Sequence, residues 1–287
     1  MISLSRWSFP LALLLLAMLA LPWSPGCGEG GPAAGAGAEH AAGASSSLAA
    51  IRERGYLIVG TAITKPFEFH DPDTNELVGL DVEIATGLAS RLGVKCEFRE
   101  MPFAALIPSL ETGKVDMTIG AMHVTDARRK SVDFAEPYLE TGLVMVVPAQ
   151  AEGKLLRAED LQGRRVGVKL GSTGDQLAQE LLSRGLRLER KEYKETLESL
   201  LDLEFGRLDV VLNDYLNTLA YFKDHPSQIK LATTAAGQVS FLSRAGFGVA
   251  FRKGSRELVE AADAALRQMK TDGTIRKIHD KWLAASR

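Results

Sequence analysis

Short apolar runs alternate with helically spaced apolar residues from about residue 47 onward. Tyr56–Gly60 is an apolar run that ends in glycine and predicts a strand. Apolar residues then recur at helical spacing over Val82–Leu92, and Gly93 supplies a C-terminal stop. Alternating apolar and polar residues predict the next strand over Val94–Phe98. The chain therefore begins its folded part as strand, helix and strand.

The same alternation continues along the chain. A helix is predicted over Ala104–Glu111 and strands over Val115–Ile119 and Arg164–Val168. A Gly-Ser-Thr-Gly loop and a helix through Leu182 follow. This order predicts α/β layers with mostly parallel strands.

One stretch of the pattern occurs twice. Leu110–Ile119 and Leu203–Leu212 carry Leu, Glu, Gly, a basic residue, an aliphatic residue and Asp in the same register. Either chance similarity of two helix–turn–strand units or two lobes of similar build would produce this echo. Ligands of open α/β sheets bind beyond the carboxyl ends of the strands, so the echo marks the loops after Ile119 and Leu212 as candidate sites.

Opposite charges follow the two echoed strands. Arg128 lies in the loop after the first strand, and Asp214 follows the second. Arginine can bind a carboxylate through two parallel hydrogen bonds, and aspartate can accept from an ammonium, so the pair suits a zwitterion. The alternatives are a surface charge for Arg128 and a helix N-cap for Asp214.

The N-terminal segment has the composition of an export signal. Leu11–Leu21 is an apolar run too short to span a bilayer, and residues 1–27 are predicted to be a signal peptide. Small residues before Cys27 favour lipoprotein processing with lipidation of that cysteine, although an ordinary signal peptide cut nearby is the alternative. Residues 28–50 are rich in Gly, Ala and Ser and predict a flexible tether.

Composition excludes several other classes. The 287 residues carry a formal net charge of −2, so no basic footprint for nucleic acid is present. The second of the two cysteines, Cys96, lies in a predicted strand and is expected to be a buried thiol. The spacing of Cys and His residues does not match a zinc site, and neither a metal nor a cofactor is expected.

A series of ordered motifs runs from about Tyr56 to Leu283. The motifs are Pro66–Phe69, Val78–Asp81, Leu106–Leu110, Thr125–Arg128, Val132–Tyr138, Thr141–Leu143, Asp272–Thr274 and Lys281–Trp282. With them the chain resembles the amino-acid-binding family of bacterial extracellular solute-binding proteins, family 3, which are receptors of polar amino-acid importers.

The resemblance implies a two-lobed, type II periplasmic-binding-protein-like fold of two doubly wound α/β lobes joined by two crossing strands. Lobe 1 would hold residues 51–141 plus 242–287, and lobe 2 residues 142–241. The crossings would lie near Glu140–Val144 and Gln238–Arg244. Ligand would close the cleft by hinge bending.

The resemblance also assigns residues to the site. Arg128 would hold the ligand carboxylate, Asp214 its ammonium, and Gly120 and His123 would add backbone groups. Ser172 and Thr173 would bind the carboxylate from the second lobe, where a turn that opens a helix offers N–H groups to an anion. The remaining candidates are Phe103, expected to cover the ligand side chain or simply to belong to the core, and Lys169, Asn213 and Thr64.

Departures from the family pattern bear on specificity. The loop Thr61–Lys65 lacks the aspartate and the aromatic residue that often precede the Pro66 motif, so a cationic ligand is disfavoured. Lys169 matches a lysine that contacts the side chain in glutamine-binding members. His123 replaces the usual Ser or Thr, where it either adds a larger donor or acceptor near the carboxylate end or contributes backbone groups alone. With Asn213 nearby, these residues favour a neutral polar or acidic amino acid.

The resulting hypothesis is an extracytoplasmic receptor that delivers a free amino acid to the membrane permease of an ABC importer. It would be periplasmic or at the cell surface, monomeric, lipid-anchored through Cys27, and not an enzyme. The alternatives are a sensory lipoprotein with a signalling partner and, with less support, an enzyme similar to cyclohexadienyl dehydratases. The enzyme would need a tuned acid or base in the cleft, and the family pattern places no carboxylate there beyond Asp214.

Overall fold

The computed structural model describes residues 47–151, 153–225 and 228–283. The predicted signal peptide, Cys27 and residues 28–46 of the predicted tether lie outside the described residues. The first described helix, α1 (Leu48–Arg54), already includes the last three residues of that tether. Ser47 caps it by accepting the backbone N–H of Ala50, and Leu48 and Ile51 are buried, so residues 48–50 are helical and belong to the folded part rather than to the tether.

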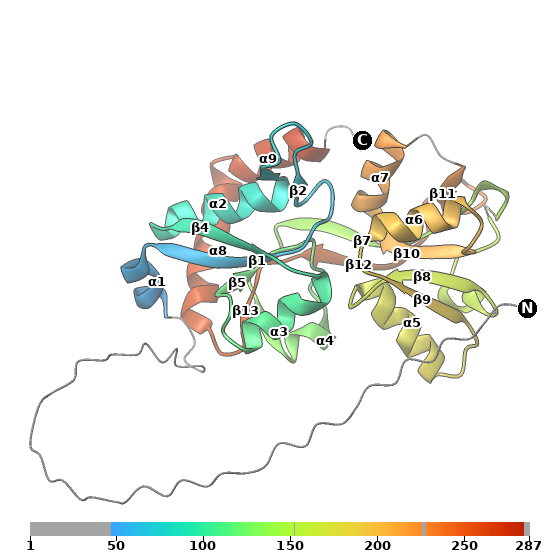
Figure 1. The fold of residues 1–287 in the computed structure, drawn as a ribbon, viewed down its shortest axis with the longest axis horizontal. Helices are drawn as coiled ribbons and strands as arrows, with labels where there is room; N and C mark the ends of the chain where they lie inside the picture. Colours follow the sequence, from blue (N-terminus) through green and yellow to red (C-terminus); the bar gives the residue numbers. More distant parts are fainter. Residues whose placement is uncertain (1–46, 152, 226–227, 284–287) are drawn as a thin grey trace, which may run out of the picture. The chain divides into compact units, whose positions relative to one another are not determined.

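Two sheets organise the described residues (Figure 1). The first sheet has the order β4-β1-β5-β13-β6. Its strands are β1 (Tyr56–Thr61), β4 (Lys95–Glu100), β5 (Met117–Thr118), β6 (Val132–Phe134) and β13 (Ala250–Arg252). β1 pairs in parallel with β4 and β5, whereas β13 is antiparallel to β5 and β6.

Helices cover both faces of this sheet. One face carries α2 (Leu80–Leu92), α8 (Arg256–Thr271) and α9 (Thr274–Leu283), and the other carries α3 (Leu106–Glu111), as Figure 1 shows. The 3₁₀ turn η1 (Phe103–Ala105) leads into α3. We call this sheet with its helices, α1, the short helix α4 (Asp126–Arg129), and the hairpin β2 (Phe69–His70) and β3 (Leu77–Val78) the first lobe.

The second sheet has the order β11-β7-β10-β8-β9, and β12 pairs with β7. Its strands are β7 (Leu139–Pro148), β8 (Arg165–Lys169), β9 (Glu189–Tyr193), β10 (Val210–Asp214), β11 (Ile229–Leu231) and β12 (Phe241–Phe247). Helix α5 (Thr173–Ser183) covers one face, and α6 (Thr196–Glu204) and α7 (Tyr215–Asp224) cover the other (Figure 1). The turns η2 (Ala149–Ala151) and η3 (Ala158–Leu161) complete this second lobe.

Two strands connect the lobes. β7 follows β6 of the first sheet and enters the second, and β12 returns before β13 of the first. The two strands pair antiparallel from Leu139 opposite Phe247 to Val144 opposite Phe241. The arrangement confirms the two-lobed α/β fold. The second connecting strand extends past the predicted Gln238–Arg244, and the domain boundaries at 141/142 and 241/242 stay predictions within these strands.

Parallel pairing is confined to one side of each sheet, β4-β1-β5 in the first and β10-β8-β9 in the second, because β13 and β7 run antiparallel to their neighbours β5 and β10. The predicted strand Val115–Ile119 is shorter as well, since only Met117 and Thr118 pair as β5. Cys96 is half-buried in β4, so the expected full burial is wrong, and within the described ranges it has no disulfide partner. Partial burial raises the pKa of its thiol to about 11.

The two echoed segments fold alike. Gly113 and Gly206 both adopt φ of 69°, in the left-handed region that glycine tolerates best. Asp116 then accepts the backbone N–H of Ile58 in β1, and Asp209 accepts that of Arg165 in β8, at 2.8 Å in each case. The equivalent turns and contacts support two lobes of similar build, and they leave the loops after β5 and β10 at corresponding places.

Candidate functional site

A polar cavity of about 50 Å³ lies between the two lobes. Loops that follow β1, β5, β8 and β10 border it, as the rule for open α/β sheets requires. All ten residues predicted as ligand contacts line this one cavity: Thr64, Phe103, Gly120, His123, Arg128, Lys169, Ser172, Thr173, Asn213 and Asp214. Their role in binding stays a prediction.

Arg128 is a buried cation beside the cavity. It lies in α4, whose N-cap Thr125 accepts the backbone N–H of Arg128, and its side chain is 3% exposed. Nη1 donates to the carbonyl of His123 at 2.7 Å and Nη2 to that of Gly171 in the second lobe at 3.1 Å. Burial lowers the pKa of Arg128 to about 10. Arg128 is therefore not the surface charge that was the alternative.

The guanidinium of Arg128 contacts two backbone carbonyl groups. Within the part of the chain that the structure describes, no carboxylate forms a salt bridge with it. A buried charge without a counter-charge is costly, and an anion in the adjacent cavity would offset that cost. The arrangement is suited to hold a carboxylate.

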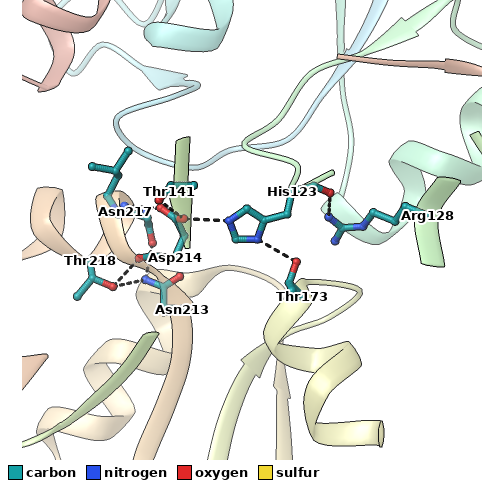
Figure 2. A network of polar contacts seen from close by, with 9 residues as sticks. His123, Arg128, Thr141, Thr173, Asn213, Asp214, Asn217 and Thr218 are labelled. Carbon is teal, nitrogen blue, oxygen red and sulfur yellow. Dashed lines mark hydrogen bonds and ion pairs between the residues drawn. The ribbon is translucent and has the colours of Figure 1, made fainter. Parts of the chain in front are cut away.

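Asp214 ends β10 and caps α7 while facing the cavity (Figure 2). Its Oδ1 accepts the backbone N–H groups of Leu216 and Asn217, at 2.8 and 3.0 Å. Its Oδ2 accepts the hydroxyl of Thr141 at 2.7 Å and lies 3.1 Å from His123 Nε2. The N-cap uses Oδ1, so capping α7 does not exclude the predicted role of Oδ2 at the cavity.

His123 bridges the lobes with its ring. Nδ1 lies 3.0 Å from Thr173 Oγ1 and Nε2 lies 3.1 Å from Asp214 Oδ2, so both nitrogens contact the second lobe (Figure 2). The ring stacks on Phe247 with centroids 4.8 Å apart and is buried. Of the two readings of His123, the structure agrees with a side chain that supplies a larger donor or acceptor, since the ring itself contacts Thr173 and Asp214.

Lys169 closes the other side of the cavity. It is buried at the end of β8, and its Nζ donates to Thr64 of the first lobe at 2.8 Å. Glu195 Oε2 lies 3.5 Å from the same nitrogen, and the ring of Phe103 lies 5.1 Å away. Burial raises the pKa of Glu195, and the charge of Lys169 partly opposes that rise.

The first turn of α5 faces the cavity between these charged groups. Ser172 is its N-cap, with Oγ accepting the backbone N–H of Asp175 at 3.1 Å, and Thr173 is its first helical residue. Gly174 packs tightly, because a Cβ there would lie 2.7 Å from that of Leu212. A helix N-terminus of this kind favours an anion close to Arg128.

Asn213 is buried beside Asp214. Its Nδ2 donates to Asn217 at 2.7 Å and to Thr218 at 2.9 Å, so the amide positions α7 rather than pointing its donors at the cavity (Figure 2). Asn217 in turn donates to the carbonyl of Lys65 at 2.6 Å, across the lobes.

A pair of buried acids supports the loop at Gly120. Asp81 accepts the N–H of Ala121 and the hydroxyl of Tyr138, at 2.7 Å each, and thereby holds Ala121 at φ 48°. Burial raises the pKa of Asp81 to about 6. Burial and then the charge of Asp81 raise the pKa of the neighbouring Glu68 well above its usual range.

Sequence reasoning missed six residues that line the cavity. The position of Thr196 directly after the loop that follows β9, and that of Asn217 one turn after Asp214, were available signals. The other four residues are small or apolar, so their identity alone gave no indication of a binding site. The six are Ala121, Leu143, Gly174, Thr196, Leu212 and Asn217.

The described residues contain no cluster of three His, Cys, Asp or Glu side chains that could hold a metal ion. In the same residues, no helix has the length and apolar character needed to cross a membrane.

Two α/β lobes with strand ends facing a shared polar cavity form the architecture of a two-lobed binding protein. The family model for bacterial extracellular solute-binding proteins, family 3, matches residues 57–285. The chain belongs to this family.

Curated relatives carry names of binding proteins. L-cystine-binding protein TcyJ of Escherichia coli (strain K12) is 33% identical over 236 residues, which cover 82% of this chain and 85% of the relative. ABC transporter arginine-binding protein 1 of the same organism is 31% identical over 222 residues, covering 77% and 88%. These names confirm the prediction of a solute-binding protein rather than an enzyme.

A solved structure has the same fold. The ancestral amino acid-binding protein AncCDT-1, described as a precursor of cyclohexadienyl dehydratase, is 33% identical with a TM-score of 0.71. The match covers 84% of this chain and 100% of that protein. That protein is named for amino acid binding.

Proposed function

We propose that the protein captures a free amino acid in the cavity between its lobes and delivers it to the membrane permease of an ABC importer. One observation carries the proposal: the buried Arg128 and the carboxylate of Asp214 border the same 50 Å³ cavity from equivalent loops of the two lobes. Opposite charges at two ends of one cavity match the two charges of an amino acid.

In the proposed complex the ligand carboxylate lies against Arg128 and the first turn of α5. Arg128 supplies the charge, and Ser172 and Thr173 supply the helix N-terminus. The ammonium lies against Asp214 Oδ2, next to the hydroxyl of Thr141. The carbonyl groups that Arg128 now contacts belong to both lobes, so ligand would replace contacts that already draw the lobes together. Binding would close the cleft by hinge bending at β7 and β12.

The proposed ligand is neutral polar or acidic. Lys169 is buried on the cavity wall, and a cationic side chain would meet a like charge there. Relatives are named for L-cystine and for arginine binding. Of these two ligands, arginine carries the cationic side chain that the buried Lys169 disfavours.

The proposed location is the periplasm or cell surface, with the protein monomeric and tethered through a lipid on Cys27. The signal-like composition of residues 1–27 and the Gly/Ala/Ser-rich stretch after them support it. Cells fed a labelled fatty acid should incorporate it into the wild-type protein and not into Cys27→Ala. Equal labelling of both would show that Cys27 is not the acylated residue.

A thermal-shift screen of the protein against the twenty amino acids, cystine and several dicarboxylates tests the function. A ligand that binds only the folded state raises Tm. At a ligand concentration a hundred times Kd it adds about 2.7 kcal/mol to the free energy of unfolding. A shift with one or a few free amino acids supports capture. A flat screen overturns it, and turnover of prephenate or arogenate would then test the enzyme alternative.

A sensory role is the second candidate function, because a two-lobed binding protein can also pass the ligand-bound state on to a signalling partner. Uptake of the labelled ligand by cells that lack the gene separates the two. Lost uptake supports import, whereas unchanged uptake with an altered transcriptional response supports sensing.

A further inference from the structure

A second cavity of about 220 Å³ adjoins the polar cavity. It lies between the loop that contains Ile63 and the helices α6 and α7, so it also spans the two lobes. Its walls are mainly apolar and include Ile63, Phe69, Leu197, Leu200, Ala220 and Tyr221. We call it the annex.

The annex and the polar cavity share a boundary. Thr64, Thr196 and Asn217 line both of them. The partition consists of side-chain contacts: Lys169 Nζ donates to Thr64 at 2.8 Å, and Asn217 donates to the carbonyl of Lys65 at 2.6 Å. Side chains can rotate away from such contacts, so a ligand held in the polar cavity could extend past Thr64.

The two cavity volumes suit two different parts of an amino acid. A water-sized group needs about 10–15 Å³ by the same measure of volume. The polar cavity of about 50 Å³ therefore accommodates the few heavy atoms of an amino acid's carboxylate, ammonium and Cα. The annex of about 220 Å³ accommodates several times as many.

The charges around the annex select against a charged side-chain end. A cation would have to pass Lys169, and an anion would face Glu195 and Asp224. Glu195 and Asp224 already have cationic partners, because Lys169 lies 3.5 Å from Glu195 and Lys65 lies 2.6 Å from Asp224. Burying a further charge among apolar walls would be costly.

We propose that the annex receives the ligand side chain and that the ligand is an amino acid with a long, uncharged, largely apolar side chain. The inference rests on the proposed function, since the polar cavity must first hold the amino-acid group. It replaces the polar or acidic side chain proposed above with an uncharged, largely apolar one that has several heavy atoms beyond Cβ.

Titration calorimetry with a homologous series tests the inference. L-Alanine, L-2-aminobutyrate, L-norvaline and L-norleucine differ by one methylene each, and each methylene buried in the annex should tighten binding about fourfold. L-Norleucine should therefore bind roughly fiftyfold more tightly than L-alanine. L-Lysine, which adds a charge to the norleucine chain, should bind more weakly than L-norleucine.

A cavity-filling variant provides a second test. Ala220 is buried in α7 on the annex wall, and Ala220→Leu should reduce the norleucine-to-alanine affinity ratio from about fifty to below about five. Ala264→Leu, on an exposed position of α8, is the matched control and should keep the full ratio. The ligand series on the wild-type protein decides the question even if Ala220→Leu does not fold.

The outcomes separate the two proposals. A ratio near one with measurable binding of both amino acids overturns the annex and leaves amino-acid capture standing. Absence of binding by every amino acid overturns both. A ratio that rises along the series and falls in Ala220→Leu supports the annex.

Discussion

Nε2 of His123 lies 3.1 Å from Oδ2 of Asp214, so an imidazole of the first lobe contacts the carboxylate that the proposed function assigns to the ligand ammonium. Asp214 also accepts a hydroxyl from Thr141 and two backbone N–H groups from α7. A ligand ammonium must therefore displace the imidazole or share Oδ2 with it. The side chain of His123 therefore competes with the ligand ammonium for Asp214.

Replacing His123 should strengthen amino-acid binding. His123→Ser removes contacts to Thr173 and Asp214, each worth about 1 kcal/mol, that hold the empty lobes together. We expect binding about thirtyfold tighter by titration calorimetry, with a larger radius of gyration of the ligand-free protein in small-angle scattering. His70→Ser, at an exposed histidine, is the control and should change neither quantity. Weaker binding by His123→Ser would instead mean that the imidazole contacts the ligand.

Replacing Arg128 should weaken binding of every ligand that carries a carboxylate. Arg128→Ala leaves that carboxylate desolvated and without a counter-charge, and the loss should exceed about 2 kcal/mol, roughly thirtyfold in Kd. Arg128→Lys keeps the charge but cannot form two parallel hydrogen bonds, so its loss should be smaller. Titration calorimetry measures both. An Arg128→Ala protein that binds as tightly as the parent would remove Arg128 from the site.

Replacing Asp214 by asparagine separates its two roles. The asparagine oxygen can still accept the N–H groups of Leu216 and Asn217, so the N-cap of α7 is kept and Tm should change little. Loss of the negative charge should weaken binding of a free amino acid by about tenfold or more. The N-acetylated ligand, which lacks the ammonium, is the control. If both ligands lose affinity equally, Asp214 does not bind the ammonium.

Local sequence patterns anticipated the elements that place the site. The apolar run at Tyr56–Gly60 and the helical spacing over Val82–Leu92 correspond to β1 and α2. The echo around Asp116 and Asp209 correctly located the two loops, because the same turn and the same carboxylate contact recur in each lobe. The direction of the strands could not be predicted as well. The strand Ala250–Arg252 has only three residues, too few for a sequence pattern to show that it pairs antiparallel with β5.

Contacts between distant segments could not be read from spacing. The bond from Ala121 to Asp81 joins residues 40 positions apart, and that from Asn217 to Lys65 spans 152. His123 drew attention as a departure from the family pattern, yet its contact with Asp214 depends on how the lobes pack. The annex is likewise formed by apolar residues of three separate segments, each of which looks like ordinary core in sequence.

The pKa of about 6 at Asp81 makes the stability of the protein depend on pH with a definite sign. The folded protein keeps this carboxyl protonated up to about pH 6, whereas the unfolded chain releases the proton near its ordinary pKa of 3.8. Stability is therefore lost as pH rises from about 4 to 6, by about 3 kcal/mol for a fully buried group shifted by roughly two units. Burial also raises the pKa of Glu68, so this group lowers stability in the same direction as pH rises.

Urea unfolding of the wild type and Asp81→Asn at pH 4, 5, 6 and 7 isolates this effect. Asparagine cannot accept from both Ala121 and Tyr138 with one oxygen, so the variant should be less stable at pH 4. The difference in unfolding free energy between Asp81→Asn and the wild type should shrink by about 3 kcal/mol between pH 4 and 7, because the asparagine has no proton to lose. Asp71→Asn removes a partly exposed carboxylate whose pKa is lowered by backbone hydrogen bonds, and the stability difference between this variant and the wild type should not shrink over that range. A constant deficit for Asp81→Asn would mean that Asp81 is ionised without cost, and that the loop at Ala121 is held by a charged carboxylate.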